Sequence, residues 1–347
     1  MKKWHKALLA FLCSFLICNL LYMAYGSGCG FVSRQHGATE GINIPNTYNV
    51  HGTEGYSIIR FDKNGYNNIN GELEKSYVLL MGSSHVEGIY LAQEKNMTYI
   101  LNKLLGGTND RLRAYSIGCS GNYFPKVVKG FQAGISEFQG ANAVIIEVNS
   151  TSFSMDDLQD GLNQTIYDPS SNGNNLVHYL TAKQKMKVCF RQMLPLARHI
   201  VSDQLRNIKL VEGEPFGLQI SHEEQTELIV DASYYNELLN QVFTLIREEY
   251  ENPIIIFYHP EVELNGSEML IVRDEETYDI FKDACEQNGI IFADMGETFE
   301  AAYESSYIVP YGFANTEMGQ GHLNEDGHAI IAHELYHILM EMQEVQF

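Results

Sequence analysis

The stretch YVLLMGSSHVEG, residues 77–88, joins an apolar run to a pair of serines enclosed by glycines. The run at 77–81 is continuous rather than alternating, which is typical of a strand buried on both faces of a sheet. We predict that the strand ends at Gly82 and that a helix begins at the serines. Such a turn exposes a serine hydroxyl beside the backbone N–H groups of a helix N-terminus. One of the two serines, Ser83 or Ser84, is therefore a candidate nucleophile.

Four more apolar runs repeat this strand pattern along the chain. They are AYSIG at 114–118, AVIIEV at 143–148, PIIIFYH at 253–259 and GIIFADM at 289–295. Helical patterns alternate with them, at 97–105, 234–250 and 276–289. The alternation predicts an α/β fold with a five-stranded parallel sheet covered by helices. In such sheets ligands bind beyond the carboxyl ends of the strands.

The C-terminal stretch GHLNEDGHAIIAHELYH, residues 321–337, allows two catalytic interpretations. HELYH matches the HExxH pattern of zinc peptidases. If Asn324 caps a helix, however, the apolar stripe of that helix faces the core, and His333 and His337 fall on its polar face. Only ten residues follow His337 to supply a third zinc ligand. We therefore expect neither a metal nor another cofactor. In the second interpretation a histidine of this stretch is the base that a serine nucleophile requires.

The serine turn, a glycine after the second run and a histidine before the last helix occur together in this chain. Gly82-Ser83-Ser84 is followed by Gly121, in GCSGN, and by His322 with Leu-Asn after it. In residues and order these blocks resemble the SGNH, or GDSL-type, hydrolases. The resemblance implies a three-layer α/β/α, flavodoxin-like fold, with Ser84 as nucleophile and His322 as general base.

The same resemblance implies an oxyanion hole. Two of its donors would be the N–H groups of Ser84 and Gly121, because a glycine lets the backbone approach a tetrahedral oxyanion closely. The third donor in the superfamily is an asparagine after the third strand. Alignment through the strand places Thr151 there, and Asn149 lies two residues earlier. We expect Asn149 to be the third donor.

The chain also departs from the superfamily at two aspartates. Ser83 replaces the aspartate of the first block, and Gly319 stands where the aspartate that orients the histidine is expected. Glu317, Asp326, Asp294 or a backbone carbonyl are alternatives for the orienting group. A Ser-His dyad is a further one, because a carboxylate is not strictly required to hold the imidazole.

The expected function is that of a serine esterase that removes O-acyl groups, such as O-acetyl, from a surface carbohydrate. The first alternative is an O-acyltransferase that uses the same site beside a polytopic membrane acyltransferase. The second is an SGNH-like binding module without activity, which the two missing aspartates and the altered third block motivate.

The N-terminal residues 1–25 predict a membrane anchor. An uncharged apolar run at 7–25 is about as long as a bilayer-spanning helix. Lys2, Lys3 and Lys6 precede or open it, so we expect a single-pass cell-membrane protein with its N-terminus inside and its domain outside. The alternatives are a secreted protein after signal cleavage and a lipoprotein attached through Cys29.

Composition and charge limit the classes of ligand that we expect the protein to bind. Outside the first six residues, 20 basic residues face 44 acidic ones, which makes nucleic acid an improbable ligand. Four cysteines lie outside the anchor, and they allow three disulfide pairings. We expect a stalk at 26–55 and one hydrolase-like domain at 56–347, with an insertion at about 152–233.

Overall fold

The computed structural model describes residues 3–26, 31–34, 36–69, 73, 76–108, 112–168, 186, 193–198 and 231–346. At its centre five strands form one parallel sheet, in the spatial order β6-β5-β7-β8-β11. They are β5 (Ser76–Met81), β6 (Leu112–Ser116), β7 (Ala143–Val148), β8 (Ile254–Tyr258) and β11 (Ile291–Asp294). Counted along the chain this order is second, first, third, fourth, fifth, as in flavodoxin-like folds. The predicted fold class is confirmed.

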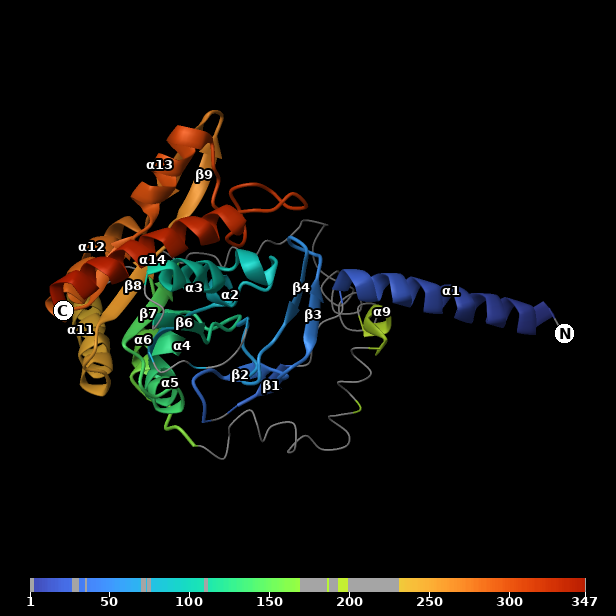
Figure 1. Ribbon diagram of the computed structural model, residues 1–347, viewed down its shortest axis with the longest axis horizontal. Helices are drawn as coiled ribbons and strands as arrows, with labels where there is room; N and C mark the ends of the chain where they lie inside the picture. The colour runs from blue at the N-terminus through green and yellow to red at the C-terminus, as the bar shows by residue number, and fades with distance from the viewer. Residues whose placement is uncertain are drawn as a thin grey trace.

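Helices cover both faces of the sheet, which makes three layers (Figure 1). One face carries α3 (Met97–Thr108), α13 (Gly296–Ser306) and α14 (Glu325–Gln346). The other carries α4 (Phe124–Lys129), α5 (Phe131–Glu137), α6 (Met155–Gly161), α11 (Ala232–Glu249) and α12 (Glu275–Gln287). Successive strand residues point to opposite faces, so Leu79 enters one core and Leu80 the other. Both are fully buried, which explains why the apolar runs are continuous.

The ends of the predicted strands and helices differ from the observed ones by at most three residues. Two short elements follow the first strand: the helix α2 (Ser84–Glu87) and the 3-10 helix η1 (Gln93–Lys95). An antiparallel hairpin of β9 (Glu261–Asn265) and β10 (Glu268–Val272) stands between β8 and α12. The sequence analysis did not predict this hairpin, whose side chains are mostly exposed.

Residues 26–55 differ from the stalk expected there. Within residues 31–60, β1 (Phe31–Ser33) pairs with β2 (Gly41–Asn43), and β3 (Tyr48–His51) pairs with β4 (Ser57–Arg60). The segment packs on the domain through the buried Ile42 and through an ion pair, 2.7 Å long, between Arg34 and Glu137 on α5. Strands of three or four residues are too short to show a period of two, which is why the sequence resembled a linker.

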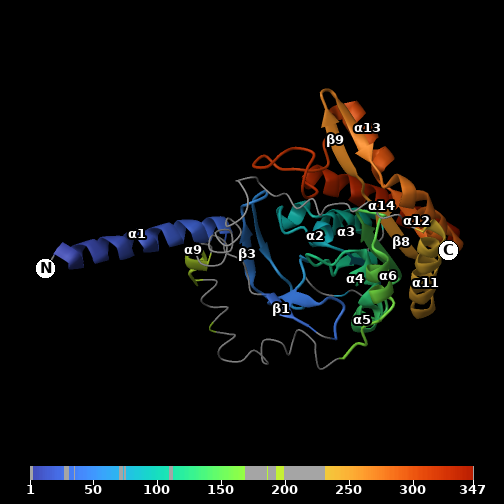
Figure 2. The ribbon, with the colours of Figure 1, turned by 180° about the vertical axis from the view of Figure 1, so that it is seen from behind.

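The helix α1 (Lys3–Gly26) projects away from the domain, as both ribbon views show (Figures 1 and 2). Among the described residues it is the one helix long and apolar enough to cross a membrane. A signal sequence satisfies the same test, so the geometry fits both the anchor and the cleaved signal.

The insertion expected at about 152–233 begins with α6, which packs against α4 and α11 as part of the outer layer. Further along, the short helix α9 (Pro195–Arg198) lies beside α1. Most of the predicted insertion after residue 168 lies outside the described residues.

Candidate active site

The turn after β5 presents Ser84 at the carboxyl edge of the sheet. Ser83 is the N-cap of α2, and its Oγ atom accepts a hydrogen bond from the N–H of His85. Ser84 is the first residue of that helix and is half-buried. Serine is a favoured N-cap because its hydroxyl satisfies a free backbone donor. Ser83 therefore caps the helix with an uncharged hydroxyl group, at the position where the superfamily has an aspartate.

His322 meets this serine from the other end of the chain. Its Nε2 atom lies 2.8 Å from Oγ of Ser84. The two residues directly after His322 are fixed in place, Leu323 by its bridge to Tyr311 and Asn324 as a helix cap. The amide oxygen of Asn324 accepts hydrogen bonds of 3.0 Å from the first turn of α14, which confirms the predicted cap. The two residues predicted as nucleophile and base are thus in hydrogen-bonding contact.

The carboxylate that orients His322 is Glu54, which the sequence analysis did not consider. Its Oε2 atom lies 2.7 Å from Nδ1 of His322, and its Oε1 atom accepts the backbone N–H of His322, also at 2.7 Å. Asp294, one of the alternatives, instead binds Arg273 and Tyr278. Ser84, His322 and Glu54 form a hydrogen-bonded triad in this order.

Electrostatics keep Glu54 ionised. Burial alone would raise the pKa of its carboxyl group, but the hydrogen bonds from the side chain and backbone of His322, and the positive charge that His322 can carry, outweigh burial and lower it. A carboxylate that stays charged holds the proton of the imidazole on Nδ1, which leaves Nε2 free to accept a proton from Ser84. The tautomer required of a general base is therefore the favoured one.

The loop around Glu54 is fixed by a single asparagine. Asn315 donates to the carbonyl groups of Gly52 and Gly55, both at 3.1 Å, and accepts the N–H of Gly55 at 2.8 Å. Asn315 lies seven residues before His322, in the same C-terminal loop. The acid and the base of the triad are therefore held by one connected set of hydrogen bonds.

The two backbone N–H groups predicted as oxyanion donors belong to Ser84 and Gly121. Gly121 has a φ of 80°, which favours glycine, and nothing approaches the position where a side chain would begin. Among the described residues, no acceptor binds the N–H of Gly121 or of Ser84. Glu87 of α2 holds the glycine loop by accepting hydrogen bonds from the N–H, at 2.9 Å, and the hydroxyl of Ser120. Burial raises the pKa of Glu87, and its hydrogen bonds act against that shift.

The third expected donor is less well defined. Thr151 is fully buried and turned away, with its N–H 2.8 Å from a carboxylate oxygen of Asp274. This removes Thr151 as a donor to a ligand. Asn149 lies exposed just after β7, without a hydrogen bond to fix its side chain among the described residues. Its role stays a prediction.

The structure thus has the predicted order of parallel strands, and the serine turn and the histidine loop are in contact at the end of the sheet. In fold the chain resembles the SGNH hydrolases, which confirms the predicted resemblance at the level of the fold. Glu54 makes the contact with His322 that the missing aspartate was expected to make.

Solved structures of similar fold include hydrolases. LAE5, an alpha/beta hydrolase from the metagenome of Lake Arreo, is 14% identical, with 75% of this chain and 93% of that chain covered and a TM-score of 0.42. The acetyl xylan esterase AlAXEase is 13% identical, with 76% and 98% covered and a TM-score of 0.41. A catalytic mutant of the acetylxylan esterase Axe2 from Geobacillus stearothermophilus is 14% identical, with 79% and 95% covered and a TM-score of 0.37. No protein-family model matches the sequence, and no curated protein is detectably similar to it.

Tyr90 is a second residue of this SGNH-like site that the motifs did not reveal. Its ring stacks on that of His322, with centroids 3.8 Å apart and planes 25° apart. Its hydroxyl group interacts with those of Ser120 and Ser84. Burial, followed by the nearby carboxylates of Glu87 and Glu54, raises its pKa, so the phenol stays protonated.

A buried polar cluster lies directly behind the serine turn. Glu147, from β7, accepts hydrogen bonds from the N–H and hydroxyl of Ser83 and lies 2.9 Å from Nε2 of His259. The other ring nitrogen of His259 lies 2.8 Å from the hydroxyl of Tyr311. His85, also buried, accepts the N–H of Leu323 at 3.3 Å. The cluster thereby fixes both the nucleophile turn and the histidine loop.

The same cluster brings three groups of metal-binding type, His85, Glu147 and His259, within 4.8 Å of one another. Both oxygens of Glu147 and both nitrogens of His259 already have hydrogen-bond partners in the protein. A metal would have to replace those bonds, so we interpret the cluster as a hydrogen-bond network. His333 and His337 of the HELYH motif are exposed on α14, on its solvent face as predicted.

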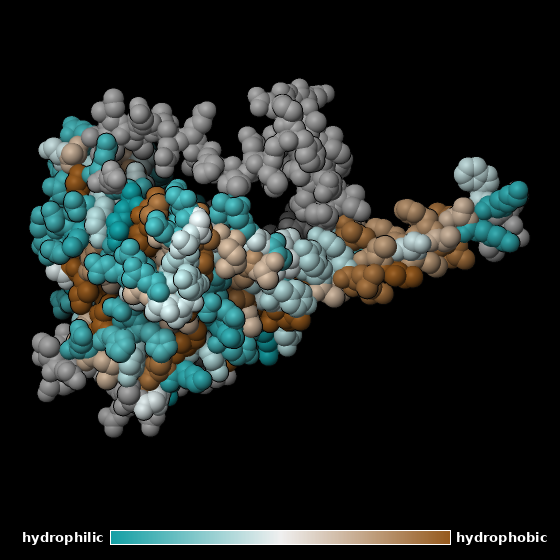
Figure 3. Space-filling view, turned by 90° about the horizontal axis from the view of Figure 1, so that it is seen from above, coloured by the Kyte–Doolittle hydropathy of each residue, from teal (hydrophilic) through white to brown (hydrophobic). Residues whose placement is uncertain are grey.

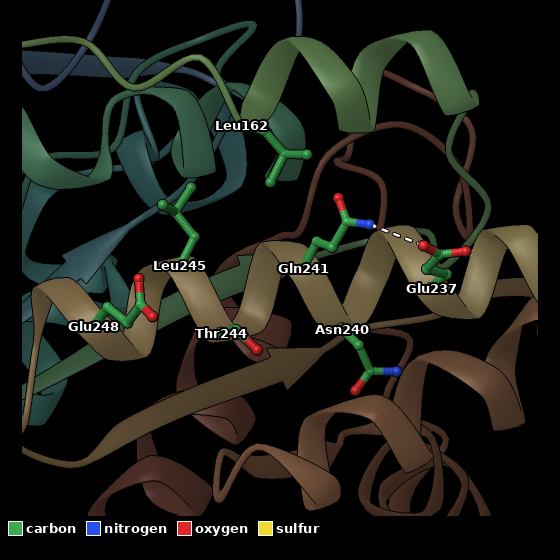
Figure 4. Close-up of a pocket in the computed structure, with 7 residues that line it drawn as sticks. All are labelled: Leu162, Glu237, Asn240, Gln241, Thr244, Leu245 and Glu248. Carbon is green, nitrogen blue, oxygen red and sulfur yellow. Dashed lines mark hydrogen bonds between the residues drawn. The ribbon is translucent and has the colours of Figure 1, made fainter.

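A hollow lies between α11 and Leu162 (Figure 4). Leu162, Leu245 and Thr244 line it together with acidic and amide side chains, among which Gln241 donates to Glu237 at 3.3 Å. None of its lining residues belongs to the site at the strand ends. Among the described residues that line the hollow, no nucleophile is hydrogen-bonded to a base.

Proposed function

We propose that the protein is a serine esterase that removes O-acyl groups, with O-acetyl groups of a surface carbohydrate as the expected substrate. The observation that carries the proposal is the unbroken chain of hydrogen bonds from Ser84 through His322 to Glu54, 2.8 and 2.7 Å long. A serine hydroxyl is a weak nucleophile until an adjacent base accepts its proton. This chain supplies the base and an acid that orients it.

In the first half of the reaction, Oγ of Ser84 attacks the ester carbonyl carbon and its proton moves to Nε2 of His322. The carbonyl oxygen becomes an oxyanion that accepts hydrogen bonds from the N–H groups of Ser84 and Gly121. Glu54 stabilises the imidazolium through its Nδ1 proton. The C–O bond to the alcohol then breaks, and the imidazolium gives its proton to the leaving oxygen.

In the second half, water replaces the alcohol. His322 accepts one proton from the water as its oxygen attacks the acyl carbon. The bond between that carbon and Oγ of Ser84 breaks, and the serine recovers a proton from the imidazolium. The free acid leaves, and the atoms of the ester and of one water molecule account for both products.

We place the domain outside the cytoplasm, on the membrane face to which α1 leads. The lysines at positions 2, 3 and 6 favour an inside location for the N-terminus. An exported site matches esters of surface glycans. A secreted form, released by signal cleavage, would meet the same substrates.

A second candidate function is transfer of the acyl group to a sugar hydroxyl instead of water. The observation that favours it is a contact between the site and the anchor: Tyr56, two residues after Glu54, donates to the carbonyl of Ala24 in α1 at 2.9 Å. A site next to the membrane is well placed to receive an acyl group from a polytopic membrane acyltransferase. The two functions differ in the fate of the acyl group, so the ratio of free acid to acylated sugar separates them.

The remaining alternative, a binding module without activity, loses its main motivation in the structure. It rested on the missing aspartates at 83 and 319 and on the altered third block, of which the aspartates were the larger part. Glu54 supplies the orienting carboxylate, and Ser83 caps the helix. We therefore favour a catalytic role.

Covalent labelling of the full chain with a fluorophosphonate probe tests the proposal. We expect the label on Ser84, mapped by mass spectrometry, and its loss in His322→Ala. The matched control is His337→Ala, which removes an exposed histidine of α14 and should label like wild type. A Ser84→Ala variant that hydrolyses p-nitrophenyl acetate as fast as wild type would exclude the mechanism.

A further inference from the structure

The helix α1 ends at the loop that carries the catalytic acid. Gly52 packs so closely against the last turn of α1 that a side chain there would begin 2.6 Å from the carbonyl oxygen of Tyr25. Tyr56 donates to the carbonyl of Ala24 at 2.9 Å. Glu54 lies between these two contacts, and two residues span at most about 7 Å. The triad is therefore attached to the end of the helix on both sides of its acid.

The dimensions of α1 set the level of this loop relative to a bilayer. Its 24 residues extend about 36 Å, whereas the hydrocarbon core of a bilayer is about 30 Å thick. Trp4 and Tyr25 mark its two ends, where aromatic side chains favour the membrane–water interface. Figure 3 shows the helix as a hydrophobic rod with a hydrophilic tip at its free end. When α1 spans the membrane, its last turn lies among the lipid headgroups.

One polar residue within the apolar helix has a partner from the same chain. Asn19 is buried, donates to the carbonyl of Met193 at 2.8 Å and accepts the N–H of Leu196 at 3.2 Å. Seven residues of helix, about 10 Å, separate it from Gly26. An amide at that depth needs such partners, because lipid offers none. When α1 spans the membrane, the described residues 193–198 of the insertion therefore lie at the depth of Asn19.

The hairpin β3–β4 crosses the end of α1, between the helix and the central sheet, in both ribbon views (Figures 1 and 2). Its outer face carries Tyr48 and Ile58, which are 61% and 57% exposed, and Arg60, which lies over the ring of Tyr48. Aromatic, aliphatic and arginine side chains together suit a headgroup layer. We name this face, formed by Tyr48, Ile58 and Arg60, the hairpin face.

From this placement we propose that the triad acts at the membrane surface, on an acyl ester whose carrier is embedded in the bilayer. The proposal rests on the proposed esterase function and adds the class of substrate, an amphiphile with its ester among the headgroups. Such a substrate reaches the site by lateral diffusion. A soluble polymer has to enter between the domain and the bilayer, so it is the poorer substrate.

The activity arm uses the full chain reconstituted in lipid vesicles, with two fluorogenic acetyl esters that share their leaving group. One ester is attached to a lipid tail and the other is water-soluble. We expect kcat/KM to be at least about tenfold higher for the lipid-attached ester. A factor of that size corresponds to roughly the free energy of burying one aliphatic side chain. A flexible Gly/Ser linker inserted after Gly26 should remove the preference. Equal rates in the unmodified chain would overturn the proposal.

The placement arm needs no activity and uses the single tryptophan of the chain, Trp4. In a Trp4→Phe background, Ile58→Trp puts a fluorophore on the hairpin face. Leu270→Trp is the matched control, since Leu270 is also an exposed aliphatic residue on a two-stranded hairpin, β9–β10. Lipids with a nitroxide headgroup should quench the first fluorophore at least about threefold more than the second, because such quenching acts only at short range.

The two arms separate the two proposals. Quenching at position 58 without hydrolysis of either ester would reject the esterase and support the membrane placement. Hydrolysis of both esters at equal rates, with equal quenching at positions 58 and 270, would overturn the membrane placement and leave the esterase intact. Preference for a soluble acetylated glycan over the lipid-attached ester would assign the site to polymers.

Discussion

Two Glu–His pairs contact the nucleophile turn, one through Ser84 and the other through Ser83, and they differ in exposure and in their further partners. His322 and Glu54 are 2.7 Å apart, with 24% and 19% of their side chains exposed. His259 and Glu147 are 2.9 Å apart, with 0% and 1% exposed. The free nitrogen of the first pair meets the hydroxyl of Ser84, and that of the second meets Tyr311.

The comparison shows that a Glu–His pair becomes a catalytic base only through its third partner and its access to substrate. The buried pair has no route to a substrate, and both its ends are occupied by the protein. It holds the backbone of Ser83 and so the position of the nucleophile. One pair is thus expected to move protons, and the other to keep the turn in place.

The largest expected effect separates the pairs by activity. Glu54→Gln should lower kcat about 10³- to 10⁴-fold, because the amide no longer favours the reactive tautomer or stabilises the imidazolium. The free energy of unfolding of this variant should differ from that of wild type by less than about 1 kcal/mol, because the Glu54–His322 pair is partly exposed. The measurements are p-nitrophenyl acetate hydrolysis and urea unfolding. A loss of less than tenfold in kcat would instead indicate a Ser-His dyad.

The buried pair should respond in the opposite way. Glu147→Gln replaces one acceptor oxygen by an NH₂ group that faces a donor, so it should cost about 3 kcal/mol of unfolding free energy. Its kcat per folded molecule should stay within about tenfold of wild type, because the triad keeps all its members. Chemical denaturation combined with active-site titration measures both. Unchanged stability with a 10³-fold loss of kcat would place Glu147 in the chemistry.

Local patterns predicted much of the fold and two of the three triad residues. The five strands are buried on both faces, so their sequence is a continuous apolar run that can be read without the structure. Ser84 and His322 each lie in a short motif beside a strand end or a helix cap. At these positions the candidate catalytic residue lies within the same short motif that forms the turn or the helix cap.

Glu54 and Tyr90 could not be predicted in the same way, because tertiary contacts alone give them their roles. Glu54 stands 268 residues before His322, among glycines and in a segment without a period. The only local signal is an acid between two glycines, in HGTEGY, and acids occur in many loops. Tyr90 follows the first block by six residues and depends on the position of a ring from the C-terminus.

Burial around the second pair should also make the domain sensitive to acid. Burial, followed by the nearby His259 and His322, lowers the pKa of His328 to about 3. An unfolded histidine has a pKa of about 6.5, so below that pH the unfolded state binds a proton that the folded state refuses. Above about pH 6.5 His328 is neutral in both states and does not lower the free energy of unfolding. As the pH decreases below that value the free energy of unfolding decreases too, by about 2 kcal/mol at pH 5. In His328→Asn, the amide oxygen can accept the N–H of Met97 in place of the ring nitrogen. Urea unfolding of this variant should show a free energy of unfolding that depends less steeply on pH than that of wild type. An unchanged pH dependence would contradict the assignment.

The smallest expected effect concerns the rings that flank each pair. Tyr90 stacks on His322, so Tyr90→Leu should free the imidazole and lower kcat about tenfold, whereas Tyr90→Phe keeps the ring and should lower it less than about threefold. Tyr311→Phe is the counterpart at the buried pair: it removes a hydroxyl bound to His259 and to two carbonyl groups, and should lower stability by about 1–2 kcal/mol with little change in kcat. Steady-state kinetics and thermal unfolding of the three variants compare the pairs directly. If Tyr90→Phe were as slow as Tyr90→Leu, the hydroxyl group near Ser84 and not the stacked ring would be the part that serves catalysis.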